Sequence, residues 1–288
     1  MEKAEKYIAQ NNLNSYYIAE YAEGKIAAKQ LQQANRLNCI YSVSKNFIAT
    51  AIAMLEYRKL LSVKDLARKY LESYFSALNA PYDEKWNVIT VENLLSHCWG
   101  QEKGNFFEAD RYSHDDDWAR AILTEKLPLE VGKDMRYSNA SYYLLSLIVE
   151  SVTRRRAFDF LAEELFVPMR FEGYASGLCP KGHTVGATEM FFRVEDLIKL
   201  GVLYLQRGVY GGKRFFKEDW AARASSPAAF SGKLFYGFSF WKESENSRVY
   251  FASGAHGQLI VIDEENKRVF AVQSYENFDD LAFVKAIV

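Results

Sequence analysis

The pattern of apolar and polar positions changes along the chain, and each stretch predicts one kind of element. Residues 2–12 have the apolar spacing of a short amphipathic helix. Residues 15–22 and 26–31 favour strands, and the Glu-Gly-Lys turn between them predicts a hairpin. From Ser42 to about residue 61 the apolar positions follow helical spacing, so we expect a helix with a strongly apolar body.

The middle of the chain predicts a series of helices, and the last part predicts strands. Helical spacing recurs in residues 63–71, 90–98, 115–125, 139–155, 157–166, 194–208 and 217–224. Four later stretches alternate or run apolar between turn-forming residues, as strands do: 235–242, 247–253, 256–263 and 268–275. A Glu-Glu-Asn-Lys turn at 264–267 predicts a tight hairpin, and a helix over 278–288 closes the chain.

Strands at both ends around a helical middle predict the α+β class, because strands and helices do not alternate as they do in a parallel sheet. The strands of the two ends would form one antiparallel sheet. We expect a discontinuous sheet domain formed by residues 1–60 and 187–288, and a helical subdomain formed by residues 61–186.

Charge and composition exclude some classes of partner. The 288 residues carry a net charge of −1, which gives no general attraction to nucleic acid or anionic membranes. The longest apolar run, residues 47–55, is too short to span a bilayer. Three widely spaced cysteines, Cys39, Cys98 and Cys179, imply no disulfide framework. With no signal-peptide pattern at the start, we expect a cytoplasmic protein, although an exported chain without its leader would look the same.

Several familiar sites are missing. There is no G-x-S-x-G elbow, no phosphate-binding loop and no G-x-G-x-x-G. The four histidines are scattered without metal-ligand spacing, so we expect neither a metal nor an organic cofactor. The acidic stretch after His114 could bind a metal, but residues 113–117 more naturally cap the helix that follows, because carboxylates favour helix N-termini.

Ser42 and Lys45 form an S-x-x-K pair where the long apolar helix begins. In the simpler structural interpretation, the two residues only form the polar start of a buried helix. An acidic residue would suit the first turn of a helix better than a lysine, however. As a catalytic pair, a serine at a helix N-terminus and a lysine one turn later would lie on the same face. Desolvation by the apolar turns favours a neutral lysine amine, which is a usable base. The pair alone leaves both interpretations open.

A second motif, Tyr137-Ser138-Asn139, precedes another long apolar helix. With both motifs, the chain resembles the serine β-lactamase and penicillin-binding-protein family, in particular its class C and esterase-like branches. The stretches TVENLLSHCWG, VEDLIKLGVLYLQRGVYGGKRFFKEDW and ASGAHGQLIVIDEENKRVFAV resemble further family segments in the same order. The resemblance implies a central antiparallel sheet flanked by helices, a helical subdomain, and an active site where they meet.

The resemblance also implies roles for individual residues. Ser42 would be the nucleophile, Lys45 its activating partner, Tyr137 the general base and acid, and Asn139 a contact to the acyl side of the substrate. The family's third motif is usually Lys-Thr-Gly or His-x-Gly. Its place here falls on Ala252-Ser253-Gly254, with His256 as an alternative cation if the register differs. The backbone N–H groups of Ser42 and Ala255 would form the oxyanion hole.

These observations predict a serine hydrolase that works through an acyl-enzyme on a small ester or amide, with β-lactamase activity weak or absent, because the carboxylate-reading cation is missing or displaced. The alternatives are a true β-lactamase or D-Ala peptidase, and a non-catalytic ligand sensor of the penicillin-binding type. We expect the partner to be a small-molecule ester, amide or β-lactam, with no nucleic acid and no membrane span.

Overall fold

A central antiparallel sheet dominates the computed structural model of the chain, which describes residues 1–103 and 116–288. The strand order is β2-β1-β13-β12-β11-β10-β9-β8, so strands from the two ends of the chain pair directly. The strands are β1 (Ser15–Ala22), β2 (Lys25–Gln30), β8 (Ala229–Phe230), β9 (Phe235–Tyr236), β10 (Trp241–Lys242), β11 (Val249–Gly254), β12 (Gln258–Asp263) and β13 (Arg268–Ser274). Two small sheets are formed by β3 (Asn38–Cys39), β5 (Met190–Phe192) and β4 (Tyr174–Ser176), and by β6 (Val209–Tyr210) and β7 (Lys213–Arg214).

Both faces of the central sheet are covered, which explains why its inner strands are almost continuously apolar. In β12, Leu259 and Val261 face helices α1 (Glu2–Gln10) and α10 (Asp280–Ile287), while Ile260 and Ile262 face the opposite core. That second core is closed by α8 (Val194–Leu205), which packs on β1, β12 and β13. At Gly201 in α8 a Cβ would lie 2.4 Å from Val269 and 2.7 Å from Ile260, so a glycine is needed for this close approach.

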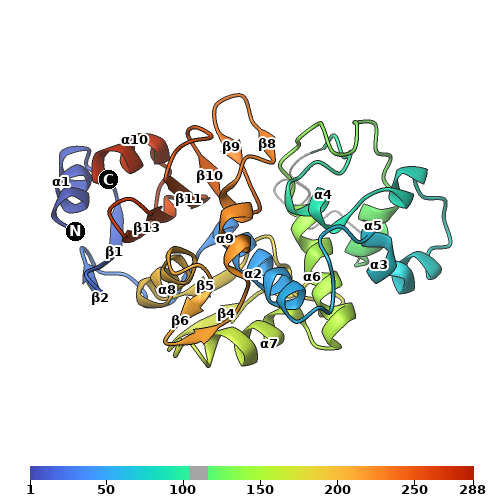
Figure 1. Cartoon of the computed structure of the whole chain (residues 1–288), viewed down its shortest axis with the longest axis horizontal. Coiled ribbons are helices and arrows are strands. Elements are labelled where there is room, and N and C mark those ends of the chain that lie inside the picture. Colours follow the sequence, from blue (N-terminus) through green and yellow to red (C-terminus); the bar gives the residue numbers. More distant parts are fainter. Residues whose placement is uncertain (104–115) are drawn as a thin grey trace.

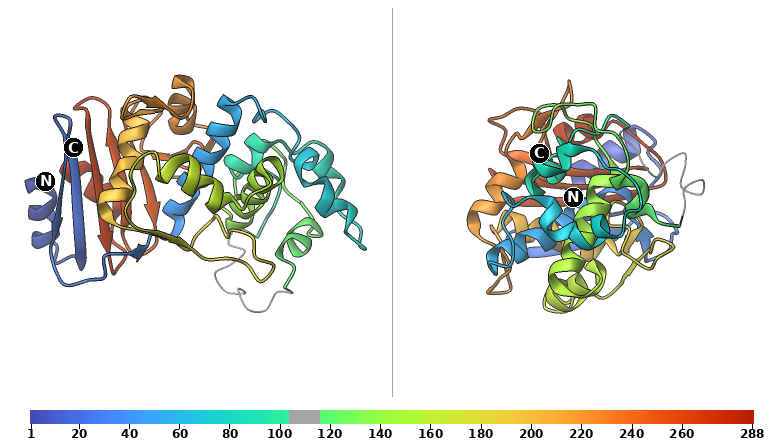
Figure 2. Two further views of the ribbon diagram at one scale, coloured as in Figure 1. Left: turned by 90° about the horizontal axis from the view of Figure 1, so that it is seen from below. Right: turned by 90° about the vertical axis from the view of Figure 1, so that its right-hand side faces the viewer.

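The helices of the chain's middle gather at one end of the sheet (Figures 1 and 2). They are α3 (Ala67–Ser76), α4 (Val91–Leu95), α5 (Trp118–Leu123), α6 (Asn139–Thr153) and α7 (Ala157–Leu161), which a π-helical turn, Ala162–Phe166, continues. Short 3₁₀ turns occur at Tyr41–Val43 and Glu84–Asn87. Helix α9 (Glu218–Ser225) precedes the last strands of the sheet. Helix α2 (Ser44–Tyr57) lies between this group and the sheet in both figures, and it is buried over most of its length. The amino end of α2 therefore lies where the two parts meet.

Most elements agree with the sequence patterns, and the α+β class with a central antiparallel sheet is confirmed. One stretch differs: residues 235–242 form two short strands, β9 and β10, with Ser239 at φ 80° between them, instead of one continuous strand. The alternating pattern of that stretch could not indicate the bend. Helix α6 ends at Thr153, and Arg154 follows in the left-handed conformation, so the consecutive residues Arg154, Arg155 and Arg156 lie just beyond the helix C-terminus.

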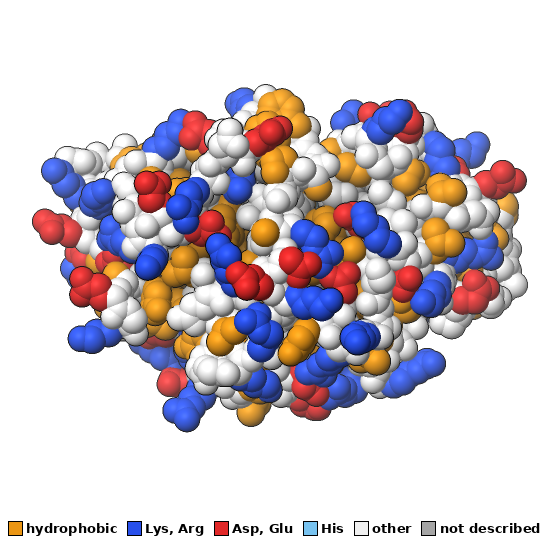
Figure 3. Space-filling view, viewed as in Figure 1, with side chains coloured by type: hydrophobic (Ala, Val, Ile, Leu, Met, Phe, Trp, Pro, Cys, Tyr) orange, Lys and Arg blue, Asp and Glu red, His pale blue; other side chains and the backbone are white. Residues whose placement is uncertain are grey.

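The surface shows no concentration of one charge on the face drawn in Figure 3, where acidic and basic side chains are interspersed. In the ranges 1–103 and 116–288, no helix is both long and apolar enough to cross a membrane. Cys98 and Cys179 are buried thiols. Asp117 caps α5 by accepting from the Arg120 N–H at 2.9 Å, as expected, whereas residues 113–115 of the same predicted cap lie outside the described residues.

Candidate active site

Ser42 lies in the 3₁₀ turn that connects β3 to α2. Its neighbour Tyr41 has φ 46°, an uncommon conformation for a residue with a side chain, and such outliers occur often at functional sites. Helix α2 has no side-chain cap, so Ser42 is not used to satisfy the helix N-terminus. The residue is partly exposed and lines two cavities.

Lys45 is 1% exposed, and its ammonium group is satisfied by three acceptors. Nζ donates to Ser42 Oγ at 3.0 Å, to Asn139 Oδ1 at 2.7 Å and to the Ala187 carbonyl at 2.9 Å. A buried lysine is costly unless its hydrogen bonds are made, and here all three N–H groups of an ammonium have a partner. The neutral amine that desolvation alone favours has only two N–H groups and would leave one of these acceptors without a proton. The S-x-x-K pair is therefore a contact in space, and Asn139 of the second motif joins it.

The neighbours of Lys45 in the first turn of α2 explain why this polar turn is buried. Ser44 Oγ accepts from the Met190 N–H at 3.2 Å, and Asn46 Nδ2 donates to the Ser239 carbonyl at 2.9 Å. These bonds tie the helix start to β5 and to the bend between β9 and β10. Serine and asparagine at these positions hold α2 in place, which fixes Ser42 and Lys45 relative to the surrounding strands.

Tyr137 lies on the loop just before α6, with its ring centroid 4.8 Å from Lys45 Nζ. The ring stacks on Trp241 at 5.7 Å and contacts the His97 ring at 4.5 Å. Ser138, the next residue, caps α6 by accepting from the Ala140 N–H at 3.1 Å. The Tyr-x-Asn spacing thus places a phenol and an amide on either side of a helix cap, both next to the Lys45 ammonium.

His97 holds the loop that carries Tyr137 through hydrogen bonds, although the sequence motifs assign it no role. Its Nδ1 accepts from the Ser138 N–H at 3.2 Å and pairs with Ser141 Oγ at 2.8 Å, and its Nε2 lies 3.1 Å from the Tyr236 hydroxyl. Burial and, to a smaller extent, the Lys45 charge lower the pKa of His97 well below its ordinary value, so the ring is neutral. Only its place in the stretch TVENLLSHCWG could have indicated it.

The end of β11 lies against Ser42, where the third motif was expected. A Cβ on Gly254 would meet the Ile40 carbonyl at 2.5 Å and the backbone nitrogen of Ser42 at 3.2 Å, so only glycine allows this approach. Ala252 is fully buried and faces the helix-side core, while Ser253 and Ala255 line cavities that contain Ser42. The structure does not bring His256 into either cavity; its ring contacts Tyr41 at 4.8 Å.

Two cavities meet at Ser42 and differ in their walls. The larger, of about 790 Å³, is bordered by Asn139, Trp118, Phe191 and Ala255 among others. The smaller, of about 370 Å³, is bordered by Tyr137 and the end of β11; its remaining lining residues are Leu234, Trp241, Phe251, Asn277, Phe278 and Asp280. Ser42 and Ala255 border both cavities, so a group held at their backbone N–H groups would be open to each side.

Asp280, the first residue of α10, is a second feature that the sequence did not indicate. Ser253 Oγ donates to its carboxylate. Burial raises the pKa of Asp280 to about 6, against a smaller lowering by the Ser253 hydrogen bond. The carboxylate of Asp280 therefore lies beside Ser253 of the expected third motif, where the family resemblance led us to look for a cation.

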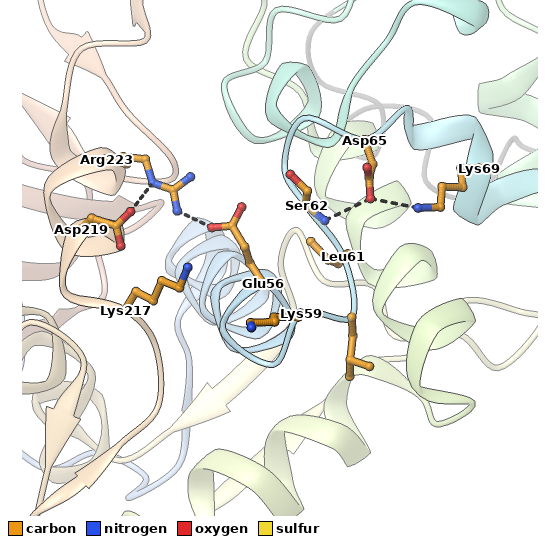
Figure 4. A pocket seen from close by; sticks show the side chains of 10 residues that line it. Glu56, Lys59, Leu61, Ser62, Asp65, Lys69, Lys217, Asp219 and Arg223 are labelled. Atoms are coloured by element: carbon orange, nitrogen blue, oxygen red, sulfur yellow. Dashed lines mark hydrogen bonds and ion pairs between the residues drawn. The ribbon is translucent and has the colours of Figure 1, made fainter.

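A further groove, of about 540 Å³, opens at the opposite end of α2 and is not part of this site (Figure 4). Its charged side chains largely pair with one another: Arg223 contacts Glu56 and Asp219, and Asp65 contacts Lys69. In the described part of the chain, no group of three or more histidine, cysteine or acidic side chains is arranged to hold a metal ion.

Comparison with known proteins identifies the family of the chain. The sequence model of the beta-lactamase family matches residues 3–282, and the chain belongs to that family. It is 22% identical over 251 residues to Penicillin-binding protein 4* of Bacillus subtilis, covering 75% of this chain and 52% of that protein. Protein flp of Staphylococcus aureus is 25% identical over 136 residues, which are 46% of this chain and 26% of that one. The chain thus spans about half or less of the length of these curated relatives.

Solved structures show the same fold. A D-alanine carboxypeptidase AmpC from Burkholderia cenocepacia superposes with a TM-score of 0.75 at 15% identity, over 99% of this chain and 95% of that one. A class C beta lactamase from Rhodobacter sphaeroides superposes with a TM-score of 0.73 at 16% identity, over 99% and 96% of the two chains. The β-lactamase and penicillin-binding fold that the motifs implied is therefore confirmed.

Proposed function

We propose that this chain hydrolyses small esters or amides through an acyl-enzyme formed on Ser42, with weak or absent activity on β-lactams. The observation that carries the proposal is the buried ammonium of Lys45, 3.0 Å from Ser42 Oγ and next to the Tyr137 ring. A buried charge of this kind costs free energy, and its use here is to stabilise negative charge on Ser42 or Tyr137.

In the acylation step, Tyr137 takes the proton of Ser42 while Ser42 Oγ attacks the carbonyl carbon. The Lys45 ammonium favours the tyrosinate form of Tyr137, because an opposite charge nearby stabilises an anion. The backbone N–H groups of Ser42 and Ala255 hold the tetrahedral oxyanion. Tyr137 then gives the proton to the leaving alcohol or amine, the carbon–oxygen or carbon–nitrogen bond breaks, and the acyl group stays on Ser42.

In the deacylation step the same groups act on water. Tyr137 removes a proton from a water molecule that attacks the acyl carbon, and it returns this proton to Ser42 as the acid leaves. Asn139, already bonded to Lys45, contacts the acyl side of the substrate. Since Tyr137 borders the smaller cavity and Asn139 the larger one, the leaving group occupies the smaller cavity and the acyl group the larger.

Substrate preference follows from the third motif. A penicillin or a peptide C-terminus presents a carboxylate, and a charge-assisted hydrogen bond to such a group contributes about 1.5–3 kcal/mol. Ala252 supplies no cation, and the hydroxyl proton of Ser253 is already donated to Asp280. Uncharged esters are therefore better substrates than nitrocefin or benzylpenicillin.

The proposal is tested by comparing turnover of p-nitrophenyl butyrate and nitrocefin by the wild-type protein and by Ser42→Ala. We expect steady hydrolysis of the ester that the substitution abolishes. A protein that forms a stable adduct with a fluorescent penicillin but turns over neither substrate would be a ligand sensor, and fast nitrocefin hydrolysis would make it a β-lactamase. Either result would contradict the proposal.

A further inference from the structure

The smaller cavity beside Ser42 carries a negative charge and no positive one among its described lining residues. Asp280 is the charged residue of this lining. None of the described lysines, arginines or histidines forms an ion pair with it, and the polar groups that act on it are Ser253 on β11 and its neighbour Asp279. Its negative charge therefore has no ion-pair partner among the described side chains.

Ser253 makes the lining of the smaller cavity still less suited to a negatively charged ligand. A serine hydroxyl has one proton to donate, and Ser253 donates it to Asp280, so the Ser253 oxygen offers only acceptor lone pairs to the cavity. A site that binds a carboxylate needs donors at this place. The Ser253 side chain offers acceptors instead, which favours a cation or a group that carries N–H donors.

Aromatic rings line the same cavity as these acceptors. Tyr137, Trp241, Phe251 and Phe278 border the same cavity, and the rings of Tyr137 and Trp241 are stacked at 5.7 Å. The faces of aromatic rings attract cations, most strongly when the site excludes water. A carboxylate and several aromatic rings thus line one small cavity, and these are the two kinds of group that bind an ammonium ion.

A purely structural role as a helix cap does not explain why the Asp280 carboxylate is turned inward. Acidic residues often occupy the first turn of a helix, but the N-cap of α10 is Asp279, which accepts from the Ala282 N–H at 3.0 Å. Asp279 is exposed, whereas Asp280 is turned inward to Ser253. Because burial raises its pKa to about 6, the ionised Asp280 costs the fold free energy that a neutral residue would not.

We propose that the smaller cavity binds a leaving group that carries a protonated or quaternary amine, with Asp280 as its counter-ion and the aromatic rings around its alkyl substituents. The proposal rests on the proposed function, and it names the class of substrate: esters or amides of amino alcohols or diamines. In acylation the cationic alcohol or amine departs with the proton from Tyr137, and the larger cavity keeps the acyl group on Ser42.

The test uses a pair of thioesters of nearly the same shape, acetylthiocholine and 3,3-dimethylbutyl thioacetate, with a thiol reagent to follow the released thiol. We expect kcat/KM for the cationic thioester to exceed that for the neutral one by about tenfold or more at about pH 8, where Asp280 is ionised. Asp280→Asn removes the charge but keeps an acceptor for Ser253, and it should abolish most of the preference. Asp279→Asn is the matched control, because it removes the same charge one residue away, and asparagine also caps a helix.

Equal rates for the two thioesters, or the same preference in Asp280→Asn, would overturn the cation site while leaving the serine hydrolase intact. If neither thioester nor p-nitrophenyl butyrate is hydrolysed, the proposed function fails instead. The cation site is then judged by calorimetry with choline and 3,3-dimethylbutanol, where choline should bind more tightly to wild-type protein than to Asp280→Asn, and equal binding would exclude it.

Discussion

Lys45 and Asp280 are two charged side chains close to Ser42, and the protein satisfies them in different ways. Lys45 is buried and bonded to three acceptors, Ser42 Oγ, Asn139 Oδ1 and the Ala187 carbonyl. Asp280 is held by the Ser253 hydroxyl and has no cation beside it among the described residues. The first charge is neutralised by dipoles arranged around the nucleophile, whereas the second is turned toward a cavity.

In our proposal, this difference separates the part of the site that acts on the scissile bond from the part that selects the substrate. The Lys45 side is assembled from two motifs of the family, and its geometry depends on a buried polar helix start. On the β11 side, Gly254 packs against Ser42, and Asp280 lines the cavity where the family resemblance led us to expect a cation. In our proposal this strand end therefore presents a negative charge to the substrate.

The largest effect is expected on the Lys45 side. Lys45→Ala and Tyr137→Phe should each lower kcat on p-nitrophenyl butyrate by about 10² or more, which is usual for the loss of a positioned acid–base group. The double variant should lose little more than the worse single one, because groups that act as one unit fail together. Steady-state kinetics on all three variants measures this, and a double variant that loses the product of the two single effects would separate Tyr137 from Lys45.

A smaller effect, on substrate preference, is expected from Asp280, which lies beside Ser253 at the end of β11. The ratio of kcat/KM for p-nitrophenyl butyrate to that for nitrocefin should fall by about tenfold in Asp280→Asn, because the variant removes repulsion of the nitrocefin carboxylate. Asp279→Asn should leave the ratio nearly unchanged. Ala252→Lys is a poorer test, since Ala252 is fully buried in the helix-side core. An unchanged ratio in Asp280→Asn would mean that this carboxylate does not face the substrate.

A third effect, similar in free energy to the second, is on stability. The pKa of Asp280 is raised to about 6 by burial, from an ordinary value of 3.8, so the native state loses stability as pH rises from about 4 to 6. At about pH 8 the free energy of unfolding of Asp280→Asn should therefore exceed that of wild type by about 1–2 kcal/mol, so the variant should unfold at a higher urea concentration. This difference in the free energy of unfolding should vanish below about pH 4. Urea unfolding of both proteins at the two pH values measures this. A less stable variant at both pH values would show that Asp280 serves the fold.

Much of this architecture was predictable because local patterns specify it. Helical spacing located α2, α6 and α8, and alternation located β11 to β13, while the two motifs indicated Ser42, Lys45, Tyr137 and Asn139. Sequence spacing could not place Asp280 beside Ser253, because the two residues are 27 positions apart and meet only when α10 folds onto the sheet. The bend at Ser239 and the support of Tyr137 by His97 also depend on contacts between distant segments.

The most direct test of the central claim is to find the residue that becomes acylated. After treatment with a fluorophosphonate, intact mass should show one added label, and trypsin should release it on residues 37–45, between Arg36 and Lys45. This peptide contains both Ser42 and Ser44, so fragmentation has to place the label on Ser42; Ser44 is fully buried and bonded to the Met190 N–H. We predict a label on Ser42 that is lost in Ser42→Ala. A label on any other serine would contradict the assignment of the nucleophile.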